Sequence, residues 1–307
     1  MRESIGVIEL IEVFDSASVK QEALLFDRIA ALRFNFTVQF MRERTKPPND
    51  DYYDTLEWLF DKGIIFEPEQ FAIDEDTAAK PDYKQFLALT KHYADKIREL
   101  ADAVEKSAHK LEGDFIPVDA SPLFLGLQYN VRLYSALLRD KKGLDAHPVI
   151  HRNFQSTENP LAKKSDIVQI TLNALPVPDE SIAWEQIIEY RSDPDSRNKF
   201  LDLRHWMSEV ARGELTPIEV EEKLEYLISQ YQRHMKIHKM KANQGVLQTI
   251  IVSPAELAEN LIKFKWGQIA KDLFSIKQRK IALMEGELTS PGSEVAYIVK
   301  ARETFSG

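Results

Sequence analysis

Two histidines are the side chains whose spacing most directly suggests chemistry. His234 and His238 lie four residues apart, so both imidazoles could bind one metal ion if the segment is a helix. A zinc peptidase needs a glutamate directly after the first histidine, but Met235 occupies that position, and the neighbouring sequence offers no third ligand. We therefore interpret both histidines as packing residues and predict no metal site.

A cluster of carboxylates around Pro194 is the second candidate for chemistry. Its members are Glu185, Glu189, Asp193 and Asp195, with Arg191 among them. Carboxylates beside an arginine suit acid–base catalysis or metal-dependent hydrolysis, but helix caps and surface ion pairs use the same residue types. The sequence also lacks a second acidic strand with a lysine at nuclease spacing. We favour the structural interpretation and predict no catalytic residue and no cofactor.

Two groups of basic residues in the carboxyl-terminal part could bind the phosphate backbone of a nucleic acid. The candidate binding residues are Arg233, Lys236, Lys239 and Lys241 in the first group and Lys263, Lys265, Lys271, Arg279 and Lys280 in the second. A solvated basic face is the alternative interpretation of the same residues. Binding to a membrane surface is disfavoured, because Trp266 lies on the apolar stripe of its predicted helix.

The histidines and the first basic group fall on the second of two amphipathic helices. Apolar residues recur at helical spacing over 200–210, and Gly213 ends the first of these helices. Thr216, Pro217 and Glu219 then form a capping box that begins the second helix. So short a connection predicts an antiparallel helical hairpin.

Other segments also have the periodicity of helices. Helices are predicted at Ala23–Leu32, Tyr52–Asp61, Tyr83–Leu111, Ser121–Leu138 and Ser253–Met284. The helix that begins at Tyr83 would be ~45 Å long at 1.5 Å per residue. It should therefore pack against another helix for most of its length, either within the chain or across a dimer.

Short strands complete the predicted fold. Strands are expected at 34–40, 64–66, 166–173 and 245–252, and 5–14 is either a strand or a short helix. A short extended piece at 145–151 could pair with the strand at 166–173. The predicted fold class is α+β and mostly helical, with long helices and an antiparallel helical hairpin around a small sheet.

The charge is spread unevenly along the 307 residues. Residues 1–120 contain 25 acidic and 15 basic side chains, a net charge of −10, whereas the rest contain 24 and 25, a net charge of +1, which gives the total of −9. We predict an acidic amino-terminal region over 1–115 that ends in the long heptad helix. A carboxyl-terminal α+β region over 116–307 would contain the hairpin and the basic long helix. This asymmetry suggests two surfaces with different partners, and a charge that serves solubility alone is the alternative interpretation.

The composition excludes several kinds of chemistry. The chain contains no cysteine, which excludes disulfides, thiolate metal sites and cysteine nucleophiles. No apolar run approaches the ~20 residues needed to span a bilayer. Glu9 and Glu12 interrupt the first apolar stretch, which a secretory signal would not contain. We expect a cytoplasmic protein that does not enter a membrane.

The centre of the chain carries a series of short motifs. It contains Leu175-Pro-Val-Pro-Asp, Trp184-Glu185, Glu189-Tyr190-Arg191, Asp193-Pro194 and Arg197, and the chain closes with Gly292-Ser-Glu-Val-Ala-Tyr-Ile-Val-Lys-Ala-Arg. This pattern resembles the central signature of a family of uncharacterised bacterial proteins. The resemblance covers about a third of the chain and implies no catalytic residue.

Three hypotheses for function follow. The first is a non-enzymatic binding or scaffold protein of a bacterial cytoplasmic complex, which binds a protein partner or associates with itself through its long helices. The second is a nucleic-acid-binding protein that uses the basic carboxyl-terminal helices. The third is a metal-dependent hydrolase that uses Glu185, Asp193 or the histidine pair.

Overall fold

The computed structural model describes residues 2–9, 16–35, 37–39, 50–108, 121–150, 164–247, 286–287 and 290–305. The chain forms two compact units. Unit 1 comprises Met1–Glu189 with Phe305–Gly307, and unit 2 comprises Tyr190–Thr304. The fold is α+β and mostly helical, as predicted, with long helices and one small sheet.

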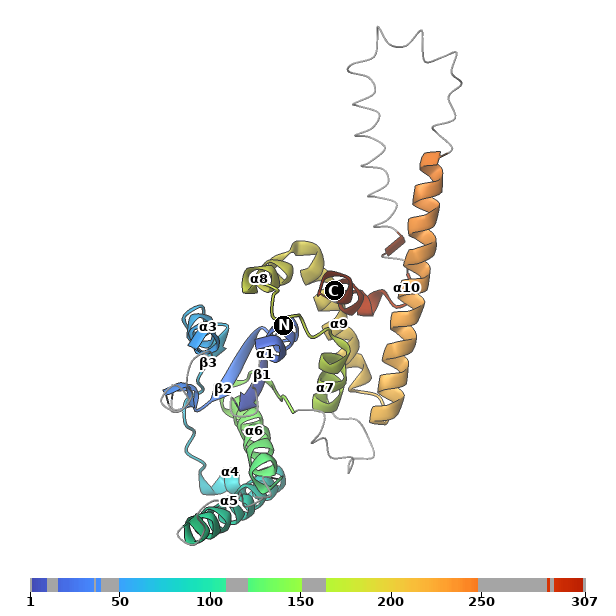
Figure 1. Cartoon of the computed structure of the whole chain (residues 1–307). Helices are drawn as coiled ribbons and strands as arrows, with labels where there is room; N and C mark the ends of the chain where they lie inside the picture. The colour runs from blue at the N-terminus through green and yellow to red at the C-terminus, as the bar shows by residue number, and fades with distance from the viewer. Residues whose placement is uncertain are drawn as a thin grey trace, which may run out of the picture. The chain divides into compact units, whose positions relative to one another are not determined.

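A parallel sheet of four strands lies at the centre of unit 1 (Figure 1). Its strands are β1 (Ser4–Glu9), β2 (Arg28–Leu32), β3 (Ile65–Phe66) and β4 (Asp145–Pro148). Their order is β3-β2-β1-β4, and each neighbouring pair is parallel. Helix α1 (Ser16–Leu25) connects β1 to β2, and α3 (Asp50–Asp61) connects β2 to β3. Parallel strands need such crossovers, because a tight turn can only join antiparallel neighbours.

The two faces of the sheet are buried in different ways. One face packs against helix α6 (Ser121–Lys142) through Ile5, Val7, Ala30, Leu32, Val131, Leu138 and Ala146. On β1, a Cβ added at Gly6 would lie 2.5 Å from Cδ2 of Phe26, so this ring packs directly on the backbone of the strand. Both faces are therefore covered, which explains why β2 is a continuous apolar strand without alternation.

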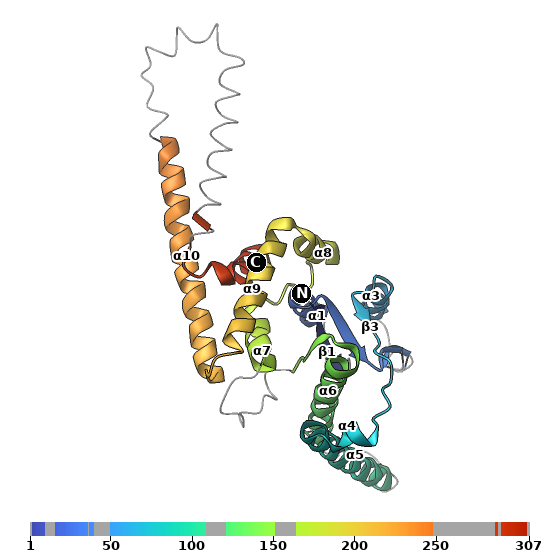
Figure 2. The ribbon, with the colours of Figure 1, turned by 180° about the vertical axis from the view of Figure 1, so that it is seen from behind.

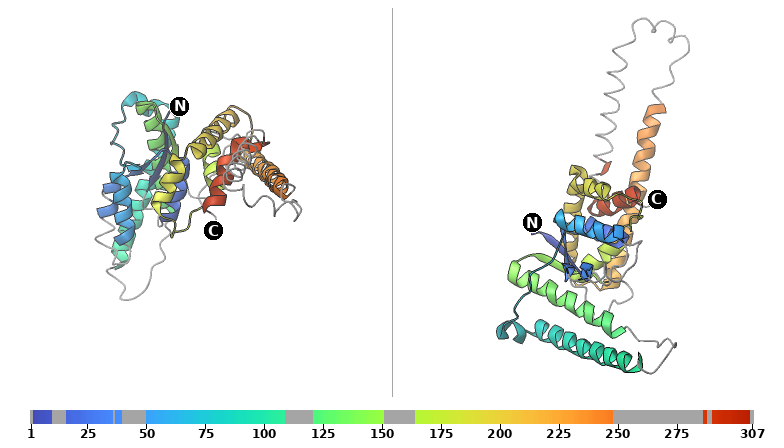
Figure 3. Two further views of the ribbon diagram at one scale, coloured as in Figure 1. Left: turned by 90° about the horizontal axis from the view of Figure 1, so that it is seen from above. Right: turned by 60° about the vertical axis from the view of Figure 1, so that its left-hand side comes forward.

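The long heptad helix of the sequence prediction is confirmed as α5 (Pro81–Ala108). It packs against α6 in the same unit, and Figure 3 shows the two helices side by side. Tyr83, Leu133 and Leu137 are buried between them, and the ring of Tyr93 stacks on that of Tyr129 at 5.6 Å. The predicted helical partner of α5 is thus supplied by the chain itself. The predicted division at residue 115 would assign α5 and α6 to different regions, whereas both belong to unit 1.

The predicted strand at 166–173 is wrong, because Lys164–Ala174 is helix α7. Its buried residues are Ile167, Val168, Thr171 and Leu172, which is the spacing of a helical face rather than strict alternation. Thr171 donates its hydroxyl to the carbonyl of Ile167 at 2.8 Å, which satisfies the polar group of this fully buried side chain within the helix. The extended piece at 145 is β4, as predicted, but it pairs with β1.

Two predictions near residue 30 are also wrong. The predicted helix over 23–32 ends at Leu25, and Arg28–Leu32 is strand β2. The predicted strand over 34–40 is replaced by helical residues at 34–35 and 37–39, while 36 and 40 lie outside the described residues. Arg33 adopts a left-handed conformation with φ 55°, which ends β2, and the amide of Thr37 donates to the carbonyl of Arg33. Phe34 and Val38 are buried one helical turn apart.

Unit 2 is helical in its described part. Its helices are α9 (Pro194–Val210), α10 (Pro217–Leu247), a short 3₁₀ turn at Ser293–Val295 and α13 (Ala296–Phe305). The last three residues of α8 (Trp184–Ser192) also belong to unit 2, whereas the last residue of α13 belongs to unit 1. The long α10 is the orange helix of Figure 2. The predicted capping box is confirmed. The side-chain carboxylate of Glu219 accepts from the backbone amide of Thr216 at 2.8 Å, and the backbone amide of Glu219 donates to the hydroxyl of Thr216. The antiparallel packing of α9 and α10 stays a prediction.

The interior of unit 2 is held by aromatic packing and ion pairs. Tyr190 donates its hydroxyl to the carbonyl of Tyr297 at 3.0 Å, and the two rings lie 5.3 Å apart. Asp193 caps α9 and accepts from Lys300 of α13 at 2.8 Å. The predicted strand at 245–252 is wrong for Gly245–Leu247, which end α10, and its remainder lies outside the described residues, as does the predicted helix over 253–284.

Candidate binding site at the carboxyl edge of the sheet

The carboxyl ends of the strands in unit 1 define the edge at which a ligand is most readily bound. The chain runs from β1 to β2 and β3 on one side and returns to β4 on the other, so the strand order reverses at β1. In open parallel sheets, ligands bind outside the carboxyl ends of the strands near such a reversal. A ligand of unit 1 is therefore expected at this edge.

A buried carboxylate ends the central strand. Glu9 is 1% exposed, and both of its oxygens accept from Nη2 of Arg33 at 3.1 Å. Asn130 of α6 donates its side-chain amide to Oε1 of Glu9 at 2.8 Å. These contacts join the ends of β1 and β2 to α6. The Arg33 side chain remains 47% exposed, so the guanidinium connects a fully buried anion with solvent.

Burial is the main influence on the protonation of this cluster. It raises the pKa of Glu9, although the charge of Arg33 and the hydrogen bonds from Asn130 and Arg33 act in the opposite direction. Burial also raises the pKa of Tyr134, and the negative charge of Glu9 adds to that effect. With its oxygens engaged by Arg33 and Asn130, Glu9 positions the ends of the strands.

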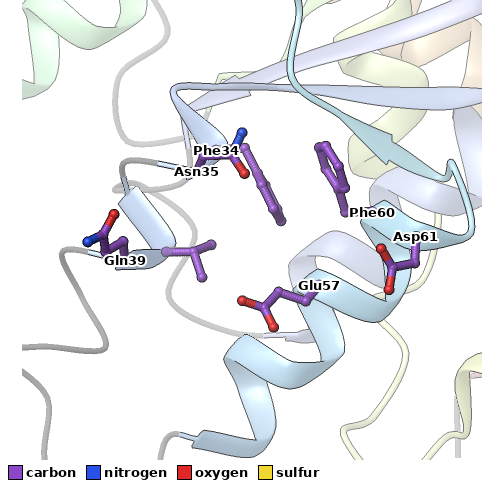
Figure 4. Close-up of a pocket in the computed structure, with 7 residues that line it drawn as sticks. Phe34, Asn35, Gln39, Glu57, Phe60 and Asp61 are labelled. Atoms are coloured by element: carbon purple, nitrogen blue, oxygen red, sulfur yellow. The ribbon is translucent and has the colours of Figure 1, made fainter.

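A pocket of about 520 Å³ lies beside this cluster, next to the carboxyl end of β2. It is lined by the helical residues that follow Arg33 and by the last turns of α3, namely Phe34, Asn35, Val38, Gln39, Glu57, Phe60 and Asp61. Figure 4 shows the Glu57 carboxylate extending from α3 toward the segment that carries Gln39. Two chain segments distant in sequence thus form one concave surface.

The pocket combines an aromatic wall with negative charge. The rings of Phe34 and Phe60 stack with their centroids 4.6 Å apart and an interplanar angle of 17°. Glu57 and Asp61 are both exposed, so their carboxylates meet solvent at the pocket. Asn35 donates its side-chain amide to Glu67 at 2.6 Å, and this bond places a third carboxylate near the pocket. Ring faces and carboxylates are the two groups that attract an organic cation.

A second pocket of about 380 Å³ lies near the carboxyl end of β4 and is lined in part by α1 and α7. The side chains of Gln21 and Gln169 in its wall are hydrogen-bonded to other groups of the protein. Gln169 accepts from the amide of Ile150 at 3.0 Å, and Gln21 donates to the carbonyls of Leu172 and Leu175. These bonds fix the loops around the pocket, so the amides serve the fold.

A buried histidine lies on β4. His147 is 2% exposed, and its Nε2 lies 3.0 Å from Oδ1 of Asp145, which also accepts from Lys164 at 2.6 Å. Burial lowers the pKa of His147, against the opposing effect of Asp145. Burial works against ionisation of Asp145, but the bonds from His147 and Lys164 hold its pKa below the usual range. The hydrogen bonds among Asp145, His147 and Lys164 connect the first residue of α7 to strand β4.

The structure describes only part of the predicted basic site. Arg233 and Lys236 are exposed on α10, and Lys239 and Lys241 fall within the same helix, although their side chains lie outside the described residues. The remaining candidates all lie outside the described residues: Lys263, Lys265, Lys271, Arg279 and Lys280. The grouping of the two basic sets therefore stays a prediction.

The carboxylates around Pro194 take part in ion pairs. Asp193 and Asp195 both accept from Lys300, at 2.8 and 2.7 Å, and Asp195 also accepts from Lys199 at 2.5 Å. The hydrogen bond from Lys300 holds the pKa of Asp193 well below its usual range. At Asp195, burial acts to raise the pKa, but the hydrogen bonds from Lys199 and Lys300 outweigh it, so the pKa of Asp195 is also lowered. These contacts agree with the structural interpretation of the cluster.

The predicted metal ligands are only partly described. His234 is half-buried on α10, whereas the side chain of His238 lies outside the described residues. Within the described ranges, no three histidine, aspartate or glutamate side chains gather as a metal site would require. In the same part of the chain, every helix is too short or too polar to cross a bilayer.

Sequence reasoning missed the whole carboxyl edge of the sheet. The apolar stretch that contains Glu9 suits either a strand or a short helix, and the alternation after Arg33 predicts an extended segment. The signal that could have located the edge is the run Arg28–Leu32, whose apolar residues suit a buried parallel strand. Recognition of that strand would have placed Arg33 and Asn35 at its carboxyl end.

Comparison with known proteins supplies no relative. No protein-family model, no curated protein sequence and no solved structure matches this chain.

Proposed function

We propose that the protein is a non-enzymatic binding protein of a cytoplasmic complex, and that the pocket between the residues after β2 and α3 receives a cationic group of its partner. The observation that carries this proposal is the half-buried ring of Phe60, stacked on the buried ring of Phe34, beside the exposed carboxylates of Glu57 and Asp61. A guanidinium or ammonium group could contact a ring face and pair with a carboxylate at the same time.

The charge of the surrounding chain supports the same class of partner. Residues 1–120 carry the net charge of −10, which attracts a basic partner over distances of about 10 Å at moderate ionic strength. Glu9, the buried carboxylate of this edge, is engaged by Arg33 and Asn130. Binding thus fits the geometry better than acid–base catalysis.

Removal of the pocket charges tests this proposal. We expect a hexa-arginine peptide to bind the full chain, and the double variant Glu57→Gln, Asp61→Asn to bind it about tenfold more weakly, because two ion pairs near a ring face are lost. Isothermal titration calorimetry at low ionic strength measures both affinities. Phe60→Leu should also weaken binding, since it removes a ring face at nearly constant volume.

The matched control is Asp54→Asn, which removes one charge from the exposed surface of the same helix outside the pocket. Its effect should stay within about twofold of the unmodified chain. Absence of binding, or a loss with Asp54→Asn as large as with the double variant, would show that the pocket does not select the ligand.

Nucleic-acid binding by α10 is the second candidate function, and the exposure of Arg233 and Lys236 favours it. If it holds, the affinity for a short DNA duplex should fall about tenfold or more between 50 and 200 mM salt, because bound counterions are released. Filter binding measures this dependence. A chain that retains no duplex at the lowest salt concentration would eliminate this candidate.

A further inference from the structure

Helix α10 exposes a continuous face whose use is separate from the pocket of unit 1. Ile218, Tyr226 and Ile237 are 69%, 61% and 43% exposed, although they are large apolar residues. At 100° per residue, all three fall within one sector of about 100° on the helix. They lie ~12 and ~17 Å apart along the axis at 1.5 Å per residue, so they mark one exposed side of the helix on which the charged residues between them also lie.

Charged residues of opposite sign occupy the two halves of the same face. Glu222 and Glu225 lie toward the amino-terminal end, and Arg233 and Lys236 lie toward the carboxyl-terminal end. All four are exposed, as is Ser229 midway between the two halves. The opposite face is buried through Val220, Leu224, Ile228 and Tyr231. The face thus has a negative end, a small central residue and a positive end.

Such a face is complementary to itself when a second copy is turned end to end. In an antiparallel pair centred on Ser229, Glu222 would lie opposite Lys236 of the second copy and Glu225 opposite Arg233, since both pairs are placed symmetrically about residue 229. Ile218 would lie within one turn of Ile237 of the second copy. The small side chain of Ser229 allows close approach at the centre.

We propose that α10 is a homodimer interface, in which two copies of this chain associate through antiparallel α10 helices about a two-fold axis at Ser229. Two-fold interfaces use the same patch on both copies, so a contact at one end is repeated at the other. Each dimer would contain four charge pairs and two isoleucine contacts, with the ring of Tyr226 near the Arg233 guanidinium of the second copy.

Charge reversal tests the interface without dependence on the pocket. The unmodified chain should sediment as a dimer at ~100 µM in low salt. The variant Glu222→Lys, Glu225→Lys and the variant Arg233→Glu, Lys236→Glu should each dissociate at least about tenfold more readily, because like charges then face each other. An equimolar mixture of the two variants should restore the dimer, since each supplies the charges that the other needs. Recovery on mixing also shows that both variants are folded.

The absence of native cysteine permits a second, independent test. Ser229→Cys should form a disulfide-linked dimer under mild oxidation, because the two thiols would meet at the axis. Ile218→Cys, which lies on the same face, should not, since its two copies would be ~33 Å apart at 1.5 Å per residue.

Several outcomes would overturn the proposal. These are a monomer at the highest concentration, dimers unaffected by charge reversal, failure of the mixture to pair, or equal cross-linking at both cysteine positions. A monomer whose duplex binding is lost with Arg233→Glu, Lys236→Glu would assign the face to nucleic acid instead.

Discussion

Replacement of Arg33 by alanine should destabilise the chain by about 3 kcal/mol at neutral pH, because the buried carboxylate of Glu9 loses its charged partner. Glu9 has no exposed side-chain surface, and Arg33 contacts both of its oxygens. Asn130 alone would remain as a donor to Oε1. Urea-induced unfolding, followed by circular dichroism, measures the loss.

The loss should depend on pH with a defined sign. Burial already raises the pKa of Glu9, and removal of Arg33 eliminates a charge that lowers it. A folded-state pKa above the unfolded value favours the fold at low pH, and this stability is lost as the pH rises through the folded-state pKa. The Arg33→Ala variant should therefore be closest to the unmodified chain at about pH 4, below the ordinary glutamate pKa of 4.5, and furthest from it at about pH 8.

Glu9→Gln provides the control for this interpretation. In the Glu9→Gln background, which has no charge at position 9 for Arg33 to pair with, Arg33→Ala should cost about 1 kcal/mol and should vary little with pH. An equal loss in both backgrounds, or one that does not change between the two pH values, would mean that Arg33 acts by packing and not through the carboxylate.

Replacement of Gly292 by alanine should destabilise unit 2 by about 3 kcal/mol, which combines backbone strain with a steric clash. Gly292 adopts φ 81°, a left-handed conformation that disfavours side chains. An added Cβ would also lie 2.4 Å from the carbonyl oxygen of Leu227 in α10. The chain cannot relieve this contact without moving the turn that leads into α13. Thermal or urea unfolding quantifies the cost.

Gly63→Ala separates the two contributions. Gly63 adopts φ 71°, but an added Cβ would have no neighbour within 4 Å among the described residues. This variant should lose only the ~1–2 kcal/mol of left-handed strain. Equal losses at Gly63 and Gly292 would show that the contact with Leu227 contributes nothing.

The helices could be predicted from sequence because their signals are local. The capping residues Thr216 and Glu219 and the proline at 217 act within one turn, and the structure confirms each of them. The stripe that begins at Tyr83 is likewise a property of one helix, and it identified α5. Caps and periodicity need no knowledge of the rest of the fold.

The strands were harder to predict because their signals depend on distant partners. The segment Lys164–Ala174 contains the β-branched residues of a strand, but packing in unit 1 buries it as a helix. Conversely, Arg28–Leu32 contains two alanines and reads as helix, yet it lies between β1 and β3 with its apolar residues buried. In both segments, tertiary contacts determine the secondary structure against the local preference of the residues.

The candidate site could not be predicted for the same reason. Phe34 and Phe60 are 26 positions apart in the sequence, and only the crossover from β2 through α3 brings their rings together. Glu9, Arg33 and Asn130 come from three different elements. Without the parallel order of the strands, nothing in the sequence places these residues at one edge.

The central claim is that the protein acts by binding a cationic group in the pocket beside β2. Hydrogen–deuterium exchange of the full chain, with and without hexa-arginine, tests it most directly. We predict slower exchange confined to the pocket residues Phe34, Asn35, Val38 and Gln39 and to the last turns of α3. Protection that lies elsewhere, for instance along α5, or no protection at a saturating peptide concentration, would contradict the account.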